Sequence, residues 1–232
     1  MESKYKIDIK QEVLKHLGLN LYSNIYAVLS EIVANSYDAD STEVTISIKD
    51  GEVWIEDNGT GMTVKDANEK FLSIGYAKRK KEGTASPKFN RPFMGRKGIG
   101  KLSLFSIAGL IEIHCCKDNQ SHGFIMDLEK LKISCDEETP YSPTEINPED
   151  VKKTTTGILI ILSKLSKKFS DPSAIKRRLA RRFGLEVAKD FKIKINDEQI
   201  ELEDRDYFDK LEYLWYIGEE SNVFSNKCQL PS

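Results

Sequence analysis

The sequence predicts an α+β fold of the two-layer sandwich type, and three observations indicate it. Residues 22–39 carry apolar side chains at positions 25, 28, 29 and 32, which is helical spacing. Two runs with alternating apolar residues, 43–48 and 53–55, lie on either side of Asp50-Gly51, which is a strong hairpin signal. Helices and strands then follow one another without strict alternation, which disfavours a doubly wound parallel sheet.

The remaining elements are expected in the following order along the chain. Short helices are predicted at residues 67–72 and 101–108, and strands at 110–116 and 123–128. An acidic surface loop with three prolines is expected over 136–153, followed by a buried strand at 157–162. An amphipathic basic helix covers 174–183, and a terminal hairpin joins 191–195 to 199–202 through Asn196-Asp197.

Composition narrows the class of protein. The 232 residues carry a formal net charge of −2, which gives no overall attraction to nucleic acid or to a membrane. There is no run of about 18 apolar residues and no secretory signal. Four cysteines without a Cys-x-x-Cys pair are typical of a reducing compartment, so we expect a cytoplasmic location. We expect one domain over 1–205 and the start of a following segment of a larger protein over 206–232.

A first polar motif lies on the helix predicted at 22–39. Glu31, Asn35 and Asp38 are spaced i, i+4 and i+7, so they share one face of that helix. A carboxylate, an amide and a carboxylate in line could hold a hydrated cation and orient a water molecule. The alternative interpretation is an ordinary solvated helix face.

A second motif, residues 57–62, follows the strand at 53–55. Its glycines, Gly59 and Gly61, permit a tight turn and the close approach of a ligand. The carboxylate of Asp57 at the strand end is a suitable acceptor for an exocyclic amine such as the N6 amino group of adenine. Met62 is expected to line the site of the base. A plain turn is the alternative, because Asp, Asn and Gly all favour turns.

A third motif is glycine-rich and lies within a long basic stretch. Gly95, Gly98 and Gly100 precede the helix predicted at 101–108, where backbone N–H groups would be open to a phosphate. The strand-turn-helix order of a dinucleotide fingerprint is missing, which excludes a Rossmann interpretation. Lys101, and then Lys78, are the best candidates for phosphate contacts. A merely solvated basic loop is the alternative.

Taken in order, the three motifs resemble the N, G1 and G2 boxes of the GHKL ATPases, the superfamily of DNA gyrase B, heat-shock chaperones, histidine kinases and MutL. The motifs are Glu-x-x-x-Asn-x-x-Asp-Ala, Asp-x-Gly-x-Gly and Gly-x-x-Gly-x-Gly, and the likeness covers roughly residues 20–200. In style they are most similar to MutL-, MORC- and heat-shock-chaperone-like members. The resemblance implies the Bergerat fold, a mixed sheet with helices on one face.

The resemblance also implies roles for individual residues. Asn35 would complete the coordination of Mg²⁺, Glu31 would be the general base, and Asp57 would select adenine. The family's later Gly-Thr pair is absent, because Ile158 follows Gly157, and Thr156 is a candidate substitute. The residues expected to bind ATP are Asn35, Asp38, Asp57, Gly59, Gly61, Met62, Lys78, Gly95, Gly98, Ile99, Gly100, Lys101 and Thr156.

By the same resemblance, the expected function is slow, magnesium-dependent ATP hydrolysis that gates a lid over about residues 75–96 and an ATP-dependent homodimer of a longer protein. Two alternatives remain: a phosphotransfer domain like that of histidine kinases, and a nucleotide sensor without turnover. Nucleic acid or a client protein would be bound through other domains, and a membrane is not expected. The basic helix at 174–183 could contact DNA, although most such helix faces are simply solvated.

Overall fold

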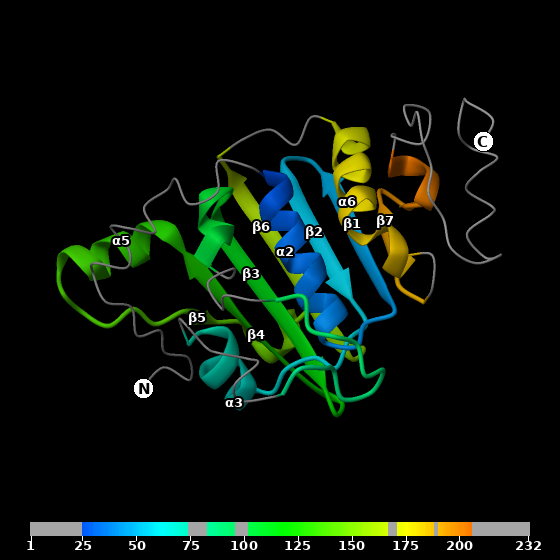
Figure 1. Cartoon of the computed structure of the whole chain (residues 1–232). Helices are drawn as coiled ribbons and strands as arrows, with labels where there is room; N and C mark the ends of the chain where they lie inside the picture. Colours follow the sequence, from blue (N-terminus) through cyan, green and yellow to red (C-terminus); the bar gives the residue numbers. More distant parts are fainter. Residues whose placement is uncertain (1–24, 74–82, 96–101, 167–170, 188–189, 206–232) are drawn as a thin grey trace, which may run out of the picture.

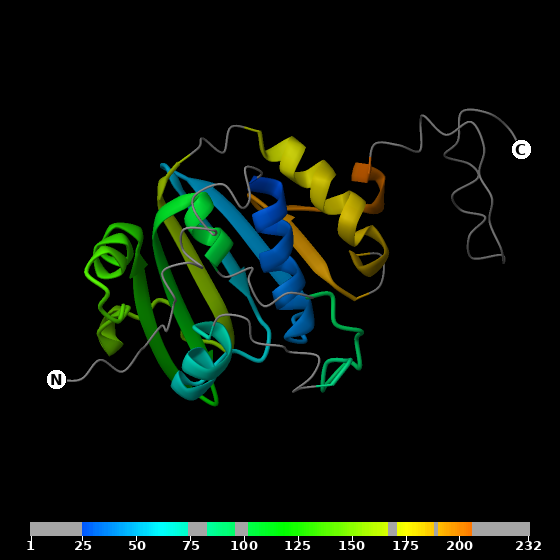
Figure 2. The ribbon, with the colours of Figure 1, turned by 60° about the vertical axis from the view of Figure 1, so that its left-hand side comes forward.

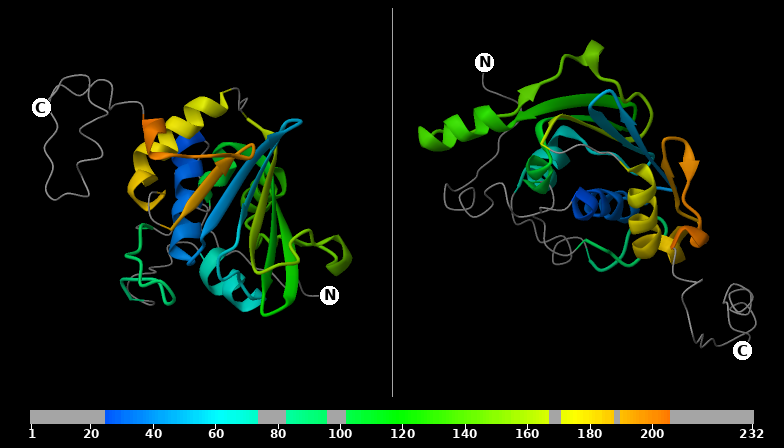
Figure 3. Two further views of the ribbon diagram at one scale, coloured as in Figure 1. Left: turned by 90° about the vertical axis from the view of Figure 1, so that its right-hand side faces the viewer. Right: turned by 90° about the horizontal axis from the view of Figure 1, so that it is seen from above.

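The fold is an eight-stranded sheet with two long helices on one face. The computed structural model describes residues 25–73, 83–95, 102–166, 171–187 and 190–205. Helices α2 (Ile25–Asp38) and α6 (Pro172–Val187) lie beside each other across one face of the sheet (Figures 1 and 2). The view from above in Figure 3 places both helices on the same side. This arrangement confirms the predicted two-layer α+β sandwich.

The sheet is mixed, and its strand order departs from the order of the sequence. The order is β5-β4-β3-β6-β2-β1-β7-β8. Every neighbouring pair is antiparallel except β1 with β7, which is parallel. The strands are β1 (Glu43–Lys49), β2 (Glu52–Asp57), β3 (Ala108–Lys117), β4 (Gln120–Asp127), β5 (Thr144–Glu145), β6 (Gly157–Leu165), β7 (Lys192–Ile195) and β8 (Glu198–Gln199).

The hydrophobic core fills the space between the helices and the inner face of the sheet. Alternate residues of the central strands, such as Ile46, Ile55 and Ile113, are buried against α2 and α6. This alternation is the period-2 pattern that the sequence predicted for β1 and β2. Helix α2 has its apolar side on the sheet, with Leu29 and Val33 fully buried. Its polar side is therefore left for a functional role.

One predicted helix is wrong in length and type. Residues 101–108 were expected to be helical, but the described part forms a 3₁₀ helix, η2 (Leu102–Ser106), and Ala108 already begins β3. The N–H of Ile107 bonds the carbonyl of Leu104, three residues back, and Ala108 pairs with Leu165 of β6. Sheet pairing thus ends the helix before it completes two turns. The helix predicted at 67–72 is present as α3 (Val64–Asp66) continued by a π-helix, η1 (Ala67–Phe71).

The segment predicted as a surface loop, 136–153, is more ordered than expected. It begins at the end of a helix that the sequence did not reveal, α5 (Leu128–Asp136), whose first N–H groups are capped by Asp127. The rest contains β5 and a 3₁₀ helix, η3 (Pro148–Asp150). Tyr141, Ile146 and Val151 are buried, so these three apolar side chains anchor the segment to the protein.

The predicted basic helix is confirmed as α6, and the terminal hairpin is confirmed as β7 with β8. The second strand of the hairpin is shorter than the predicted 199–202, because β8 ends at Gln199. A last 3₁₀ helix, η4 (Leu202–Arg205), follows. Ile175, Leu179 and Phe183 of α6 are buried, as expected for its apolar side. Several of its basic side chains are paired with acids: Lys176 with Glu198 and Asp204, Arg177 with Asp171, and Arg182 with Glu31. These pairs reduce the charge that α6 could offer to DNA.

Two further expectations concern cysteines and membranes. Cys115, Cys116 and Cys135 are free thiols, while Cys228 lies outside the described residues. Within the described ranges, no helix combines the length and apolar character needed to cross a bilayer.

Candidate functional site

The residues of the first motif on helix α2 differ in their exposure to solvent. The side chain of Glu31 is 27% exposed and Asn35 is exposed, so both are accessible to a ligand. Asp38, one turn further on, is buried with 2% of its surface exposed. The predicted shared helix face therefore divides into two accessible polar groups and one buried carboxylate.

The buried carboxylate of Asp38 binds the backbone of a distant segment. Its Oδ1 accepts a hydrogen bond from the N–H of Met94 at 2.7 Å, and its Oδ2 accepts one from the N–H of Gly95 at 3.0 Å. A Cβ atom at position 95 would lie 3.0 Å from Asp38 Oδ2 and 3.6 Å from Asn35 Oδ1. The first glycine of the third motif thus lies directly against the first motif. The other residues expected there, Lys78, Gly98, Ile99, Gly100 and Lys101, fall outside the described residues.

A second carboxylate, Asp40, holds the same segment from the end of α2. It accepts hydrogen bonds from the N–H groups of Lys88 (2.8 Å) and Phe89 (3.0 Å). Burial would raise the pKa of Asp40, but these bonds, a bond from Ser86 and the charge of Arg91 outweigh it and lower that pKa. Asp40 has a positive φ of 57°, which Asp tolerates better than most residues.

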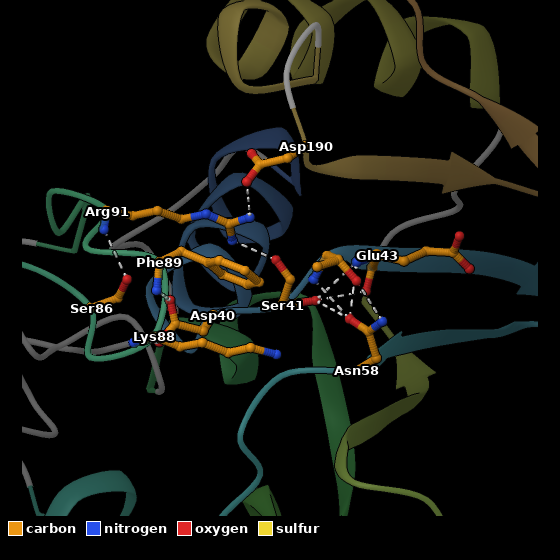
Figure 4. Close-up of polar contacts among 10 residues, drawn as sticks. Asp40, Ser41, Glu43, Asn58, Ser86, Lys88, Phe89, Arg91 and Asp190 are labelled. Carbon is orange, nitrogen blue, oxygen red and sulfur yellow. Dashed lines mark hydrogen bonds and ion pairs between the residues drawn. The ribbon is translucent and has the colours of Figure 1, made fainter.

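Arg91 fixes the middle of this segment (Figure 4). Its side chain is only 5% exposed, and it donates to the carbonyl of Ser41 at 2.5 Å and to Asp190 at 3.1 Å. The guanidinium lies over the rings of Tyr37 and Phe89, each centroid 4.6 Å away. This role is not evident from the sequence, because an arginine in a basic stretch is usually solvated. Residues 83–95 therefore have anchors that their composition did not reveal.

The carboxylate of the second motif is buried at the end of β2. Asp57 is 8% exposed, and its Oδ1 accepts from the N–H groups of Gly59 (2.9 Å) and Ile158 (3.3 Å). Its Oδ2 accepts from the hydroxyl of Ser36 at 2.9 Å. Burial raises the pKa of Asp57, and these bonds together with the charge of Lys153 oppose the rise. Each carboxylate oxygen has two lone pairs, so Oδ2 keeps one for an N–H donor of a ligand.

Two glycines at this turn are required by close packing. Gly61 has a φ of +64°, and a Cβ there would overlap the carbonyl oxygen of Cys116. Gly157 has a φ of +132°, and a Cβ there would overlap the carbonyl oxygen of Asp57. Gly61 was expected to permit the approach of a ligand, and the structure adds a packing reason for a glycine there. Gly59 is also tight, since a Cβ there would lie 2.8 Å from the carbonyl oxygen of Ala39.

Asn58 ties the turn to the start of β1, a role that sequence reasoning did not find. Its side-chain oxygen accepts from Ser41 Oγ (2.8 Å) and from the N–H groups of Thr42 (2.9 Å) and Glu43 (3.0 Å). Its side-chain nitrogen donates to the hydroxyl of Thr42 at 2.8 Å. The only sequence signal was its position between Asp57 and a glycine, which is equally typical of any turn.

The remaining predicted site residues that the structure describes are Met62, Thr156 and Glu31. Met62 is half-buried and packs against the core. Thr156 is exposed immediately before Gly157, and its contact with adenine stays a prediction. Glu31 Oε2 forms an ion pair of 3.6 Å with Arg182 of α6, which joins the two long helices beside the first motif.

Comparison with known proteins agrees with this geometry. The family model of the histidine kinase-, DNA gyrase B- and HSP90-like ATPases matches residues 22–157, more than half of the chain. The chain belongs to this family of ATPases. Membership accounts for the mixed sheet with helices on one face and for the order of the three motifs, and it implies that this GHKL-type domain binds ATP.

Two curated proteins are similar to this ATPase domain. The "Putative type II restriction enzyme HgiDII" of Herpetosiphon aurantiacus is 41% identical over 230 residues, which is 97% of this chain and 37% of that protein. "Chaperone protein HtpG" of Wigglesworthia glossinidia brevipalpis is 26% identical over 206 residues, 76% of this chain and 31% of that protein. The chain thus spans 37% and 31% of the lengths of these two relatives.

Proposed function

We propose that this domain binds ATP with Mg²⁺ and hydrolyses it slowly. The observation that carries the proposal is that helix α2 contacts Asp57 of the second motif and also carries the accessible side chains of the first motif. Ser36 on α2 donates to Asp57, the carboxylate proposed to read adenine. Asn35 and Glu31 lie on the accessible side of the same helix. A ligand bound between them would therefore have its base at Asp57 and its phosphates near Asn35.

Each residue has a distinct chemical task in this proposal. The free lone pair of Asp57 accepts a hydrogen bond from the N6 amino group of adenine, which GTP does not offer. The amide oxygen of Asn35 is a hard ligand suited to Mg²⁺, whose other ligands would be waters and phosphate oxygens. Bound there, the ion would neutralise charge on the phosphates. Glu31 removes the proton of the water that attacks the γ-phosphate.

Calorimetry with ATP and GTP, with and without Mg²⁺, tests the binding site. We expect ATP to bind and GTP to bind far more weakly. Asp57→Asn should abolish binding, because the amide can present a donor to the adenine amine in place of the acceptor. Asp50→Asn is the matched control, since it makes the same chemical change in the exposed turn between β1 and β2. Tight GTP binding, or equal ATP binding by Asp57→Asn, would reject the assignment.

Measurement of phosphate release distinguishes an ATPase from the first alternative, a nucleotide sensor that does not hydrolyse ATP. A histidine-kinase-like phosphotransfer domain would instead pass the γ-phosphate to a protein side chain, which radiolabelled ATP would reveal as a stable protein-bound phosphate. The accessible carboxylate of Glu31 favours hydrolysis over both. The cytoplasmic location expected from the cysteines stays a prediction.

We also propose that ATP binding closes a lid over the site and promotes dimerisation. Residues 83–95 are held at the end of α2 by Asp38, and just beyond it by Asp40 and by the bond from Arg91 to Ser41, so a lid would move about this anchored segment. Cleavage by trypsin after residues 78–81 and 96–97 should decrease when a non-hydrolysable ATP analogue binds. Sedimentation of the longest available form of the protein should show a dimer with the analogue. Unchanged cleavage and an unchanged mass would reject the switch.

Identity to the HgiDII protein supports a role within a DNA-processing protein. Several basic side chains of α6 pair with acids, which lowers the positive charge that this helix offers to DNA. We therefore expect duplex DNA to stimulate ATP turnover only in the longer protein. Equal stimulation of the isolated domain would place the DNA contact on the domain itself.

A further inference from the structure

A buried histidine of β4 is bonded to Met62, the last residue of the second motif. His122 is 7% exposed, and its Nε2 lies 2.8 Å from the carbonyl oxygen of Met62, a residue 60 positions earlier. A carbonyl oxygen can only accept, so the imidazole is the donor. Both the Nε2–H tautomer and the protonated ring can make this bond. The contact therefore acts as a fixed support whose presence does not depend on the charge of His122.

The tip of the β3–β4 hairpin holds the loop from Gly61 to Asp66 at two further points. The carbonyl of Cys116 lies against the Cα of Gly61 and leaves no room for a Cβ. Lys117 Nζ lies 3.1 Å from Asp66 Oδ2. Asp66 in turn closes a capping box with Thr63 at the start of α3. The hairpin thus supports one side of the loop from Gly61 to Asp66.

The two ends of the second motif are fixed by different elements. At one end, Asp57 is held by Ser36 of α2 and by the N–H of Ile158 on β6. At the other end, Met62 is held by His122 of β4. The sequence distance between Asp57 and Met62 is short, so a displacement of Met62 changes the position of the turn beside the Asp57 carboxylate.

We propose that His122 is a positioning residue for the adenine end of the nucleotide site. By bonding the Met62 carbonyl, it sets the place of the Met62 side chain and of the Gly59–Gly61 turn against the base. This inference rests on the proposed function, in which Asp57 reads adenine. His122 lies on the β3–β4 hairpin, outside the three motifs. In this inference it contributes to the affinity for the base and takes no part in phosphate chemistry.

Affinities for adenosine, ADP and ATP, measured by calorimetry, test the proposal. His122→Leu keeps the volume and removes the donor, so all three ligands should bind about tenfold more weakly, as expected when a carbonyl loses its hydrogen-bond donor. His122→Gln places an amide N–H near the position of Nε2 and should restore affinity to within about threefold. His122→Asn is equally polar but too short, so it should resemble His122→Leu. This pair of amides keeps the test valid if His122→Leu does not fold.

His114→Gln is the matched control, because His114 lies on β3 of the same hairpin and contacts Glu112 and Lys152 on the opposite face of the sheet. It should leave all three affinities unchanged. Wild-type affinities in His122→Asn, or a loss for ATP that is absent for adenosine, would overturn the inference. If Asp57→Asn abolishes binding while the His122 variants bind normally, the proposed function stands and this inference alone fails. If the wild type binds neither adenosine nor ATP, both fail.

Discussion

The backbone N–H of Gly95 donates to the buried carboxylate of Asp38 at 3.0 Å, although the two residues are 57 positions apart in the sequence. The same carboxylate accepts from Met94. Gly95 is the first residue of the third motif and Asp38 is the last polar residue of the first, so these two residues join motifs that are distant in the sequence into one hydrogen-bonded unit. A substitution on either side of this hydrogen bond should therefore alter the position or stability of the residues on the other side.

Asp38→Ala should weaken this unit more than the fold. Loss of the acceptor leaves two N–H donors without their partner, at a cost of about 1–3 kcal/mol. Amide hydrogen exchange at residues 93–95 should therefore accelerate, and ATP affinity should fall with it. Asp136→Ala, at the end of α5 and remote from the site, is the control. Exchange rates that match the wild type in Asp38→Ala would contradict this role.

Glu31→Ala should bind ATP and fail to turn it over. A general base typically contributes about 10²–10⁴-fold, so phosphate release should fall by that order while the dissociation constant changes little. Arg182→Ala separates catalysis from structure, because it breaks the same ion pair and keeps the carboxylate. A partly exposed pair contributes about 0–1 kcal/mol, so Arg182→Ala should stay near wild type. Equal losses in both variants would argue for a structural role of Glu31.

Gly61→Ala should destabilise the fold far more than Gly51→Ala. Both glycines have a positive φ, at +64° and +82°, so both substitutions introduce backbone strain. Only at Gly61 would the new methyl also overlap the backbone of Cys116; nothing lies within 4 Å at Gly51. We expect about 1 kcal/mol for Gly51→Ala and about 3 kcal/mol or more for Gly61→Ala in urea unfolding. Similar values would mean that the close contact is easily relieved.

Stability should decrease in mild acid because of His114. Burial lowers the pKa of His114, against the opposing effect of Glu112. Below about pH 6.5 the unfolded chain takes up a proton that the folded chain resists, so the free energy of unfolding falls as the pH falls. Above that pH the contribution is complete. The free energy of unfolding, measured in urea at pH 5.5 and 7.5, should differ less between the two pH values for His114→Gln than for the wild type. An equal difference would exclude His114 as the source of the pH dependence.

Arg91→Ala should cost about 2–4 kcal/mol of unfolding free energy. The substitution removes a charged hydrogen bond to Ser41 and the stacking of a cation on the rings of Tyr37 and Phe89. Lys88→Ala is the control, since Lys88 is an exposed cation on the same segment. Denaturation at low and high salt should give nearly the same loss, because the buried guanidinium is shielded from ions. A loss below 1 kcal/mol would show that the segment is held by other contacts.

The elements predicted well were those specified by local pattern. Helix α2 and the β1–β2 hairpin follow from apolar spacing and from Asp50-Gly51, and both formed as expected. The positions of Glu31 and Asn35 on an accessible helix side follow from helical geometry alone. The wrong helix at 101–108 arose because Ala108 contacts Leu165, a pairing that no local pattern encodes.

Contacts between distant segments explain the residues that were missed. Arg91 is buried only because Tyr37, Phe89 and Phe191 meet around it from separate elements. His122 gains its bond only when β4 lies beside the loop after Gly61. Helix α5 has a suitable cap in Asp127, but its short length and its position after a strand concealed it. Such features depend on strand order, which the sequence pattern did not reveal.

The placement of β1 between β2 and β7 has a consequence for biosynthesis. Glu43 of β1 pairs with Lys192 of β7, and β6 lies between β2 and β3. Helix α2 and the β1–β2 hairpin therefore leave the ribosome long before β6 and β7, the strands that pair with this hairpin. Until then the edge of β1 offers unpaired backbone groups to any other extended chain. Contacts this distant also slow folding. The nascent domain should therefore remain vulnerable to aggregation until residues 192–195 emerge, and a polypeptide stopped at residue 157 would carry all of the first motif and have no partner strand for β1 beyond β2.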